Sequence, residues 1–328
     1  MKQKITYTIA ALLAFTFFLG GCKKDGFKKL GSNDSTLTVS TVATGLYDYI
    51  TADNSGNIYA LRLNYGADTI YKFDASGTKT LFYTAPTTMD HDTVVKHTMA
   101  CLTIDSLGNI YTINYSGGTF VPNVMKITAA GLASIVYSNI TPYGGLQIQK
   151  IAVDGNGYFY FSDGHGIHTI FTNGNSELVV TGVSTFAVDR KGDIFYPTTN
   201  SSGQTSISET FTGGGLSVII AGPGSTQTSV TFNNVASMAT DSYGNVFTGE
   251  VSGTNIATIH LLKYTAYNPQ KTGWQSVTTI ISSPFGHVDG PAATAKIAVP
   301  FSMVTDAHEN LYFSEATGNP ADIRKISF

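Results

Sequence analysis

The sequence has 328 residues, of which 12% are charged, and its formal net charge at pH 7 is −3. This weak negative charge argues against nucleic acid as a partner, and two cysteines are too few for a disulfide scaffold. The 34 glycines, with many Tyr, Thr, Val and Ile residues, favour strands and turns over helices, so we expect an all-β fold.

The first residues have the pattern of a signal peptide, which we assign to residues 1–21. Lys2 and Lys4 precede an apolar run over residues 5–19, which is shorter than the roughly 20 residues that a spanning helix needs. The LGGC that closes the run resembles the lipobox of bacterial lipoproteins. The resemblance implies that Cys22 is the lipid-carrying first residue of a protein anchored in the bacterial cell envelope, with the outer membrane as the expected place. In the alternative, the ordinary signal peptidase cleaves the chain and leaves Cys22 as a thiol.

Residues 22–35 are polar, small or charged, and we expect them to be a tether between the lipid and a domain formed by residues 36–328. This domain is net acidic, because six of the chain's lysines lie in the leader and the tether. Cys101 has no cysteine partner within the domain. Its apolar neighbours predict a buried, unreactive thiol.

A short pattern, apolar-x-x-Asp-x-x-Gly-Asn-apolar-aromatic, occurs six times in the domain. Its aspartates are Asp53, Asp105, Asp154, Asp189, Asp241 and Asp306. The Asp side chain can accept hydrogen bonds from backbone amides of the turn, and Gly supplies the positive φ that a tight hairpin requires. The pattern therefore predicts six β-hairpins.

Two further strands follow most of these hairpins. The third has an apolar-x-Lys-apolar core, as in IYKFDASG and VMKITAAG, and the fourth is apolar, as in TKTLFY and LASIVY. Four antiparallel strands that recur at intervals of 35 to 65 residues match a propeller blade. We therefore expect a six-bladed β-propeller. Its last blade ends after a third strand, IRKISF, so residues 36–44, TLTVSTVAT, are expected to supply the missing outer strand.

The last copy carries a resemblance to a known repeat family. Residues 285–326 match an NHL-repeat blade at Asp289-Gly290, Ala295, Pro300, Asp306, Asn310-Leu311-Tyr312, Glu315 and Ile323-Arg324-Lys325-Ile326. The resemblance implies a six-bladed propeller. It weakens to the Asp-x-x-Gly-Asn hairpin in the other copies, and Glu309 stands where the family has Gly.

We interpret the six aspartates as turn residues, because each would bond its own turn instead of converging on a common point. A second repeated position, nine residues after each aspartate, ends the second strand. It holds Arg62, Asn114, Asp163, Thr198, Glu250 and Glu315. The arginine and the threonine exclude a full ring of metal-binding carboxylates, and the family resemblance implies that the acids cap the following turn.

Function is expected on the face opposite the Asp hairpins, where the loops stop repeating. These loops are polar and contain the candidate ligand-binding residues Tyr65, Tyr115, Phe120, Tyr143, Phe232 and Phe285. Aromatic rings beside hydroxyl and amide groups suit a sugar or peptide ligand. The same composition is also typical of ordinary surface loops.

One loop contains residue types that bind zinc, in the set Asp90, His91, Asp92 and His97. The spacing is irregular and no partner cluster occurs, so a solvated loop is the default interpretation of this set. No named catalytic motif occurs in the sequence.

The favoured function is a non-catalytic binding or scaffolding module for a glycan or protein ligand, without a cofactor. The alternative is a lactonase-like hydrolase or lyase that uses a divalent metal at the central channel. Carboxylate and amide side chains converging on the channel would favour the enzyme, whereas apolar and hydroxyl side chains would favour binding. A purely structural spacer predicts no pocket.

Lipidation can be tested by the change Cys22→Ser. Because the acyl chains would supply the membrane attachment, we expect this variant to move from the membrane pellet to the soluble envelope fraction. Fractionation with mass spectrometry of the mature N-terminus measures the effect. Unchanged pelleting without an acyl mass on the wild-type N-terminus would contradict the assignment.

Overall fold

The computed structural model describes residues 37–328 except for 64–66, 91–92, 97, 116–120, 141, 143–146, 172–173, 212–216, 226–229, 254, 265–273 and 317–320. The expected leader, the tether and Cys22 lie outside the described residues. In the part of the chain that is described, no helix is long and apolar enough to cross a membrane.

The described residues form six blades of four antiparallel strands, as the repeats predict. The first three blades are β2–β5 (Tyr49–Ala52, Ile58–Arg62, Thr69–Phe73, Lys79–Thr84), β8–β11 (Thr98–Ile104, Ile110–Tyr115, Pro122–Ile127, Ala133–Tyr137) and β12–β15 (Lys150–Val153, Phe159–Ser162, Gly166–Ile170, Ser176–Thr181). The last three are β16–β19 (Ala187–Val188, Ile194–Thr199, Thr205–Thr210, Val218–Ala221), β20–β23 (Asn234–Thr240, Val246–Ser252, Ile256–Tyr264, Trp274–Pro284) and β25–β27 (Val299–Thr305, Leu311–Ala316, Ala321–Ser327) with β1 (Thr38–Ala43). Each copy of the pattern joins the first and second strands of one blade.

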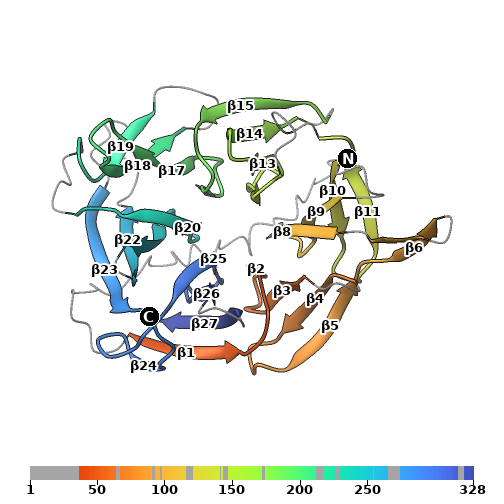
Figure 1. Cartoon of the computed structure of the whole chain (residues 1–328), viewed down its shortest axis with the longest axis horizontal. Coiled ribbons are helices and arrows are strands. Elements are labelled where there is room, and N and C mark those ends of the chain that lie inside the picture. Colours follow the sequence, from red (N-terminus) through yellow and green to blue (C-terminus); the bar gives the residue numbers. More distant parts are fainter. Residues whose placement is uncertain are drawn as a thin grey trace, which may run out of the picture.

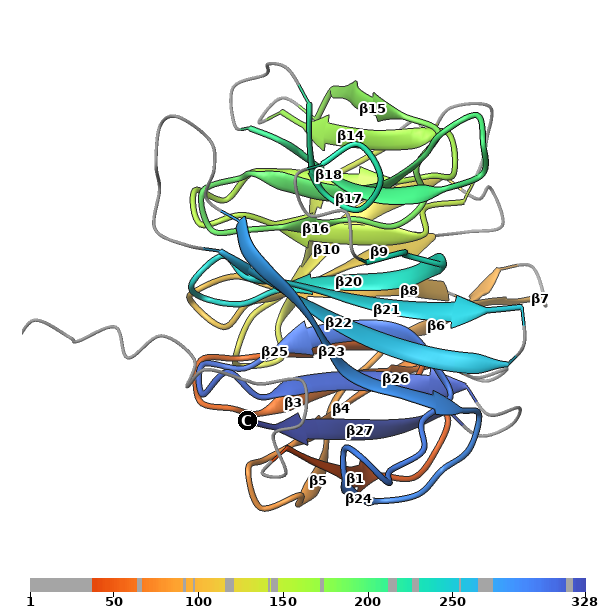
Figure 2. The same ribbon diagram turned by 90° about the vertical axis from the view of Figure 1, so that its left-hand side faces the viewer.

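The first strands of the blades, β2, β8, β12, β16, β20 and β25, surround the centre. Each of them contacts the first strand of both neighbouring blades, so the blades form a closed ring. Figure 1 shows the ring viewed along its axis, with β2, β8, β20 and β25 near the centre and β5, β15 and β23 at the outer rim. Figure 2 shows the ring from the side. The prediction of an all-β, six-bladed propeller is confirmed.

The hydrophobic core lies between the blades, with one cluster of buried side chains at each of the six junctions. In β3, Ile58 and Ala60 pack toward the last blade, whereas Tyr59 and Leu61 pack toward the second blade. Alternate residues of a strand point to opposite faces, and here both faces are covered. This explains why the second strands are continuous apolar runs such as IYAL.

The aspartates of the pattern hold their own hairpins. Asp53 Oδ1 accepts hydrogen bonds from the backbone amides of Ser55 and Asn57, both at 2.9 Å. The same two bonds recur in the other five copies. The turn glycine has a φ between 79° and 90° in five copies, and Glu309 takes its place in the sixth with a φ of 66°. A side chain in this left-handed conformation costs roughly 1–2 kcal/mol. The interpretation of the aspartates as turn residues is confirmed.

The N-terminal strand completes the last blade. β1 pairs antiparallel with β27, from Thr38 opposite Ser327 to Ala43 opposite Ile323. Leu37 also packs into the cluster between the fifth and sixth blades. The predicted closure is therefore confirmed, with one addition: the short strand β24 (Gly290–Pro291) pairs with the outer side of β1.

One loop that reads as irregular in the sequence contains a hairpin. β6 (Thr87–Asp90) and β7 (Thr93–Lys96) pair with each other between the first and second blades, and Figure 1 shows β6 extending beyond the outer rim. The β-branched residues of this segment favour strands. The expectation of a simple loop is wrong here, because the segment forms its own two-stranded pairing outside the repeat.

Ring closure can be tested by removing its outer strand. A domain that begins at residue 44, and so lacks residues 36–43, loses the pairing with β27 and parts of two core clusters. We expect its free energy of unfolding to fall by several kcal/mol, a large part of the ~5–15 kcal/mol typical of a domain. A domain that begins at residue 36 is the control. Equal melting temperatures of the two domains would contradict the closure.

Candidate functional site

The strongest candidate for a functional site is a cavity of about 580 Å³ at the centre of the ring. Residues of the first strands, or of the segments just before them, line it in all six blades, and Asp163 and Gly164 join them from the β13–β14 loop. The lining residues Tyr49 and Lys150 are the first residues of their strands. Because the Asp hairpins follow the other ends of these strands, the cavity lies toward the face of the long loops. Its size is typical of a small-molecule site.

Six lining residues share one position of the repeat, four residues before its aspartate. They are Tyr49, Cys101, Lys150, Thr185, Ser237 and Ser302, here called the channel ring. Since the aspartates occupy equivalent turns, this position contributes one side chain per blade. The position recurs in every blade, but the residue type at it differs between most of the blades. The channel ring therefore gives the cavity a lining that the repeat pattern alone does not determine.

Two hydroxyls of the channel ring join neighbouring blades. Ser237 Oγ donates to the carbonyl oxygen of Pro300 at 2.6 Å, and Ser302 Oγ accepts from the backbone amide of Ile50 at 3.2 Å. Cys101 is 2% exposed, and burial raises the pKa of its thiol to about 12. The thiol therefore stays protonated at neutral pH, in agreement with the predicted buried and unreactive cysteine.

Lys150 is the cationic residue of the lining. Its Nζ donates to the carbonyl oxygen of Met238 at 2.7 Å and lies 5.8 Å from the centroid of the Phe186 ring. Lys150 belongs to the third blade and Met238 to the fifth, so this contact joins two blades that are not neighbours in the ring. Lys150 as a whole is partly exposed. Protein atoms surround its ammonium, and the resulting desolvation lowers the pKa of this group to about 8. The group is still mainly charged at neutral pH.

Aromatic and amide groups also line the cavity. Phe301 is 46% exposed, and its ring centroid lies 5.5 Å from that of Tyr49. The side chains of Gln147 and Gln149, which also line the cavity, belong to exposed residues. The lining therefore offers both an apolar ring face and hydrogen-bonding amides to a ligand that fills the cavity.

Three of the six predicted ligand-binding aromatics lie within the described residues. Phe232 is 2% exposed, in the core cluster between the fourth and fifth blades, and Phe285 packs against the next cluster. Tyr115 is partly buried, and its hydroxyl accepts from the backbone amide of Ile148 at 3.0 Å. The rings of Phe232 and Phe285 thus serve packing, which a polar loop composition did not indicate. Tyr65, Phe120 and Tyr143 lie outside the described residues.

The predicted zinc-binding set also falls largely outside the described residues. Asp90 ends β6, but its side chain is not among those described, and neither are His91, Asp92 and His97. The described residues contain no group of three or more His, Cys, Asp or Glu side chains that could hold a metal ion. Metal binding by this loop stays a prediction.

The acids nine residues after the aspartates pair with bases on the third strand. His168 Nε2 lies 3.1 Å from Asp163 Oδ2, and His260 Nδ1 lies 2.6 Å from Glu250 Oε1. In the last blade Glu315 pairs with Arg324. In each case the base lies on the third strand, two residues after the residue that faces the acid across the strand pair. These acids are therefore engaged within their own blades.

Only one of the three acids caps the following turn as the family resemblance implies. Asp163 Oδ1 accepts from the backbone amides of His165 and Gly166. Glu250 and Glu315 instead accept from Asn233 and Ala298, which precede the first strands of their blades, at 2.9 Å each. Their longer side chains reach back across the blade, so the expectation of a following-turn cap is wrong for both.

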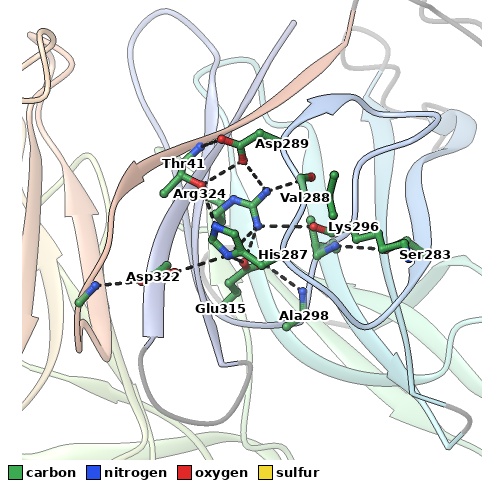
Figure 3. A network of polar contacts seen from close by, with 12 residues as sticks. Thr41, Ser283, His287, Val288, Asp289, Lys296, Ala298, Glu315, Asp322 and Arg324 are labelled. Carbon is green, nitrogen blue, oxygen red and sulfur yellow. Dashed lines mark hydrogen bonds and ion pairs between the residues drawn. The ribbon is translucent and has the colours of Figure 1, made fainter.

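The acid of the last blade belongs to a network that fastens the closing strand (Figure 3). Arg324 is fully buried and donates to Glu315 Oε1 and, at 2.8 Å, to Asp289 Oδ1. Thr41 of β1 donates to Asp289 from its backbone amide and from its hydroxyl, both at 3.0 Å. His287 lies between them, with Nδ1 2.7 Å from Glu315 and Nε2 2.9 Å from Thr41 Oγ1. These contacts, here called the lock, hold β1 to the rest of the last blade.

Comparison with known proteins supports the fold. No family model matches the chain, and no curated protein matches it. Among solved structures, a protein of unknown function from Bacteroides thetaiotaomicron has a TM-score of 0.61 at 15% identity, over 89% of this chain and 76% of that one. The PQQ-bound aldose sugar dehydrogenase of Streptomyces coelicolor has a TM-score of 0.54 at 14% identity (89% and 98%), and a gluconolactonase of Xanthomonas campestris has 0.53 at 10% identity (88% and 88%). At these identities the similarity shows the propeller fold alone.

The lock can be tested by the change Glu315→Gln, which leaves the buried Arg324 without its closest carboxylate. We expect the free energy of unfolding to fall by about 3 kcal/mol, the loss typical of a broken buried ion pair. Thr198→Val is the control, because Thr198 holds the same repeat position and bonds Ser208 at 2.9 Å through neutral hydroxyls, a loss of about 1 kcal/mol. Denaturant unfolding compares the two. The lock is refuted if Glu315→Gln costs no more than the control.

Proposed function

We propose that this chain is a lipid-anchored, NHL-type propeller of the bacterial cell envelope that binds a glycan without catalysis. The observation that carries the proposal is the cavity at the loop face, whose lining contains the exposed Phe301, with Tyr49 beside it, and the glutamines Gln147 and Gln149. The LGGC motif supports the lipid anchor, and the last blade supports the NHL-type family.

A sugar ring suits this lining for a physical reason. The C–H face of the sugar packs on an aromatic ring, while the hydroxyls around the edge of the sugar need hydrogen-bond donors and acceptors. Phe301 supplies the face, and the amides together with Ser184 and Thr185 supply the polar groups. A cavity of about 580 Å³ accepts the end of a glycan chain rather than an entire protein surface.

The metal-dependent alternative requires several acidic ligands at the same place. Among the described lining residues Asp163 is the one carboxylate, and both of its oxygens already contact backbone amides or His168. Lys150 adds a positive charge that would repel a divalent cation. The donor set of the cavity therefore favours binding of a polar organic ligand.

The proposal can be tested by glycan-array binding of the soluble domain followed by the change Phe301→Ala. We expect this change to weaken binding of the selected glycan about tenfold, because an aromatic contact worth roughly 1.5 kcal/mol is lost. Tyr158→Ala is the matched control: its ring is 47% exposed, against 46% for Phe301, but it lies in an Asp hairpin on the opposite face.

Equal binding by Phe301→Ala and the wild type, or a larger loss in Tyr158→Ala, would place the ligand elsewhere. Stoichiometric binding of a divalent metal by the purified domain would favour the enzyme instead.

A further inference from the structure

We infer that the channel cavity recognises an acidic saccharide, and that Lys150 binds its carboxylate. This inference rests on the proposed glycan binding and narrows the class of ligand. It depends on the bonds that the Lys150 ammonium makes and on those that it lacks.

The ammonium of Lys150 is not neutralised by the protein. An ammonium has three N–H donors, and the acceptor that Lys150 contacts is the neutral carbonyl oxygen of Met238. Among the described residues, no carboxylate forms an ion pair with Lys150. Two of its donors therefore make no hydrogen bond to the described residues, and they can bind a ligand in the cavity that Lys150 lines.

The nearby carboxylate of the lining is already used. Asp163 Oδ1 accepts from the backbone amides of His165 and Gly166, at 3.0 and 3.2 Å, and Oδ2 lies 3.1 Å from His168 Nε2. Asp163 is 1% exposed and is fixed by these contacts. It therefore cannot turn toward Lys150 without losing them.

Keeping a charge in this enclosed place is unfavourable without a partner. Desolvation penalises the ammonium and lowers its pKa to about 8. An uncharged side chain at position 150 could occupy the same space at a lower cost in free energy. A carboxylate from a ligand would supply the missing charge and accept the two available hydrogen bonds, in a charge-assisted contact of the stronger kind.

The surroundings of the ammonium favour a saccharide as the source of that carboxylate. Phe301 and Tyr49 offer ring faces, and Gln147 and Gln149 offer amide donors and acceptors around the same cavity. A uronic acid combines a ring face, hydroxyls and one carboxylate on a single small unit. Because the domain is net acidic, long-range attraction does not assist such a ligand, and its selection depends on contact with Lys150.

The test measures binding of glucuronate- and galacturonate-terminated disaccharides to the full soluble domain by calorimetry, each beside its carboxyl-reduced counterpart. We expect at least one acid to bind about tenfold or more tightly than its reduced form. Lys150→Met should abolish this preference, so that the acid and its reduced form bind this variant within about twofold of each other. Lys126→Met is the matched control, because it removes the same charge from β10 of the second blade, outside the cavity lining. Melting curves show whether each variant is folded.

Each outcome separates the two levels of the proposal. Equal binding of acids and reduced forms by the wild type would overturn carboxylate recognition and leave glycan binding intact. Failure of every saccharide, together with Lys150-dependent binding of a tripeptide through its C-terminal carboxylate, would overturn both the saccharide class and the proposed glycan function. The comparison of ligands on the wild type keeps the inference testable even if Lys150→Met does not fold.

Discussion

The rest of the structure depends on the pairing of β1 with β27, which joins the two ends of the propeller. Each blade buries its side chains only against its neighbours, so an open ring would leave one junction exposed on both sides. The Arg324 network adds polar contacts to this pairing, because it ties Thr41 on β1 to Asp289, beside β24, and to Glu315 on β26. Closure also creates the channel, since first strands from all six blades surround the cavity only in a complete ring.

The repeated part of the chain could be predicted from the sequence because its physics is local. The aspartate and glycine of each hairpin act within five residues of one another, so the pattern alone indicated the turns and the count of blades. The closing strand could also be predicted, because the last blade lacked a fourth strand and residues 36–44 offered one. Glu309 is the exception that the sequence flagged, and the structure shows it in the left-handed conformation that glycine adopts elsewhere.

The candidate site could not be predicted in the same way, because distant segments create it. Lys150 lies in the segment QIQKIAV, where it looks like an ordinary strand residue, and its contact with Met238 is 88 residues away in sequence. One signal was present: the residue four positions before each aspartate always reaches the channel. The aromatic residues of the loops were a poor guide to the site, since Phe232 lies in a polar loop sequence but packs into the core.

Native-state hydrogen exchange of the β1 amides tests the central claim most directly, that closure by β1 holds the whole ring together. If closure is a global constraint, the β1 amides that pair with β27 should open with the same free energy as the most protected amides of the inner strands, equal to global unfolding. Exchange of those β1 amides at a much lower opening free energy, with the inner strands still fully protected, would contradict this account.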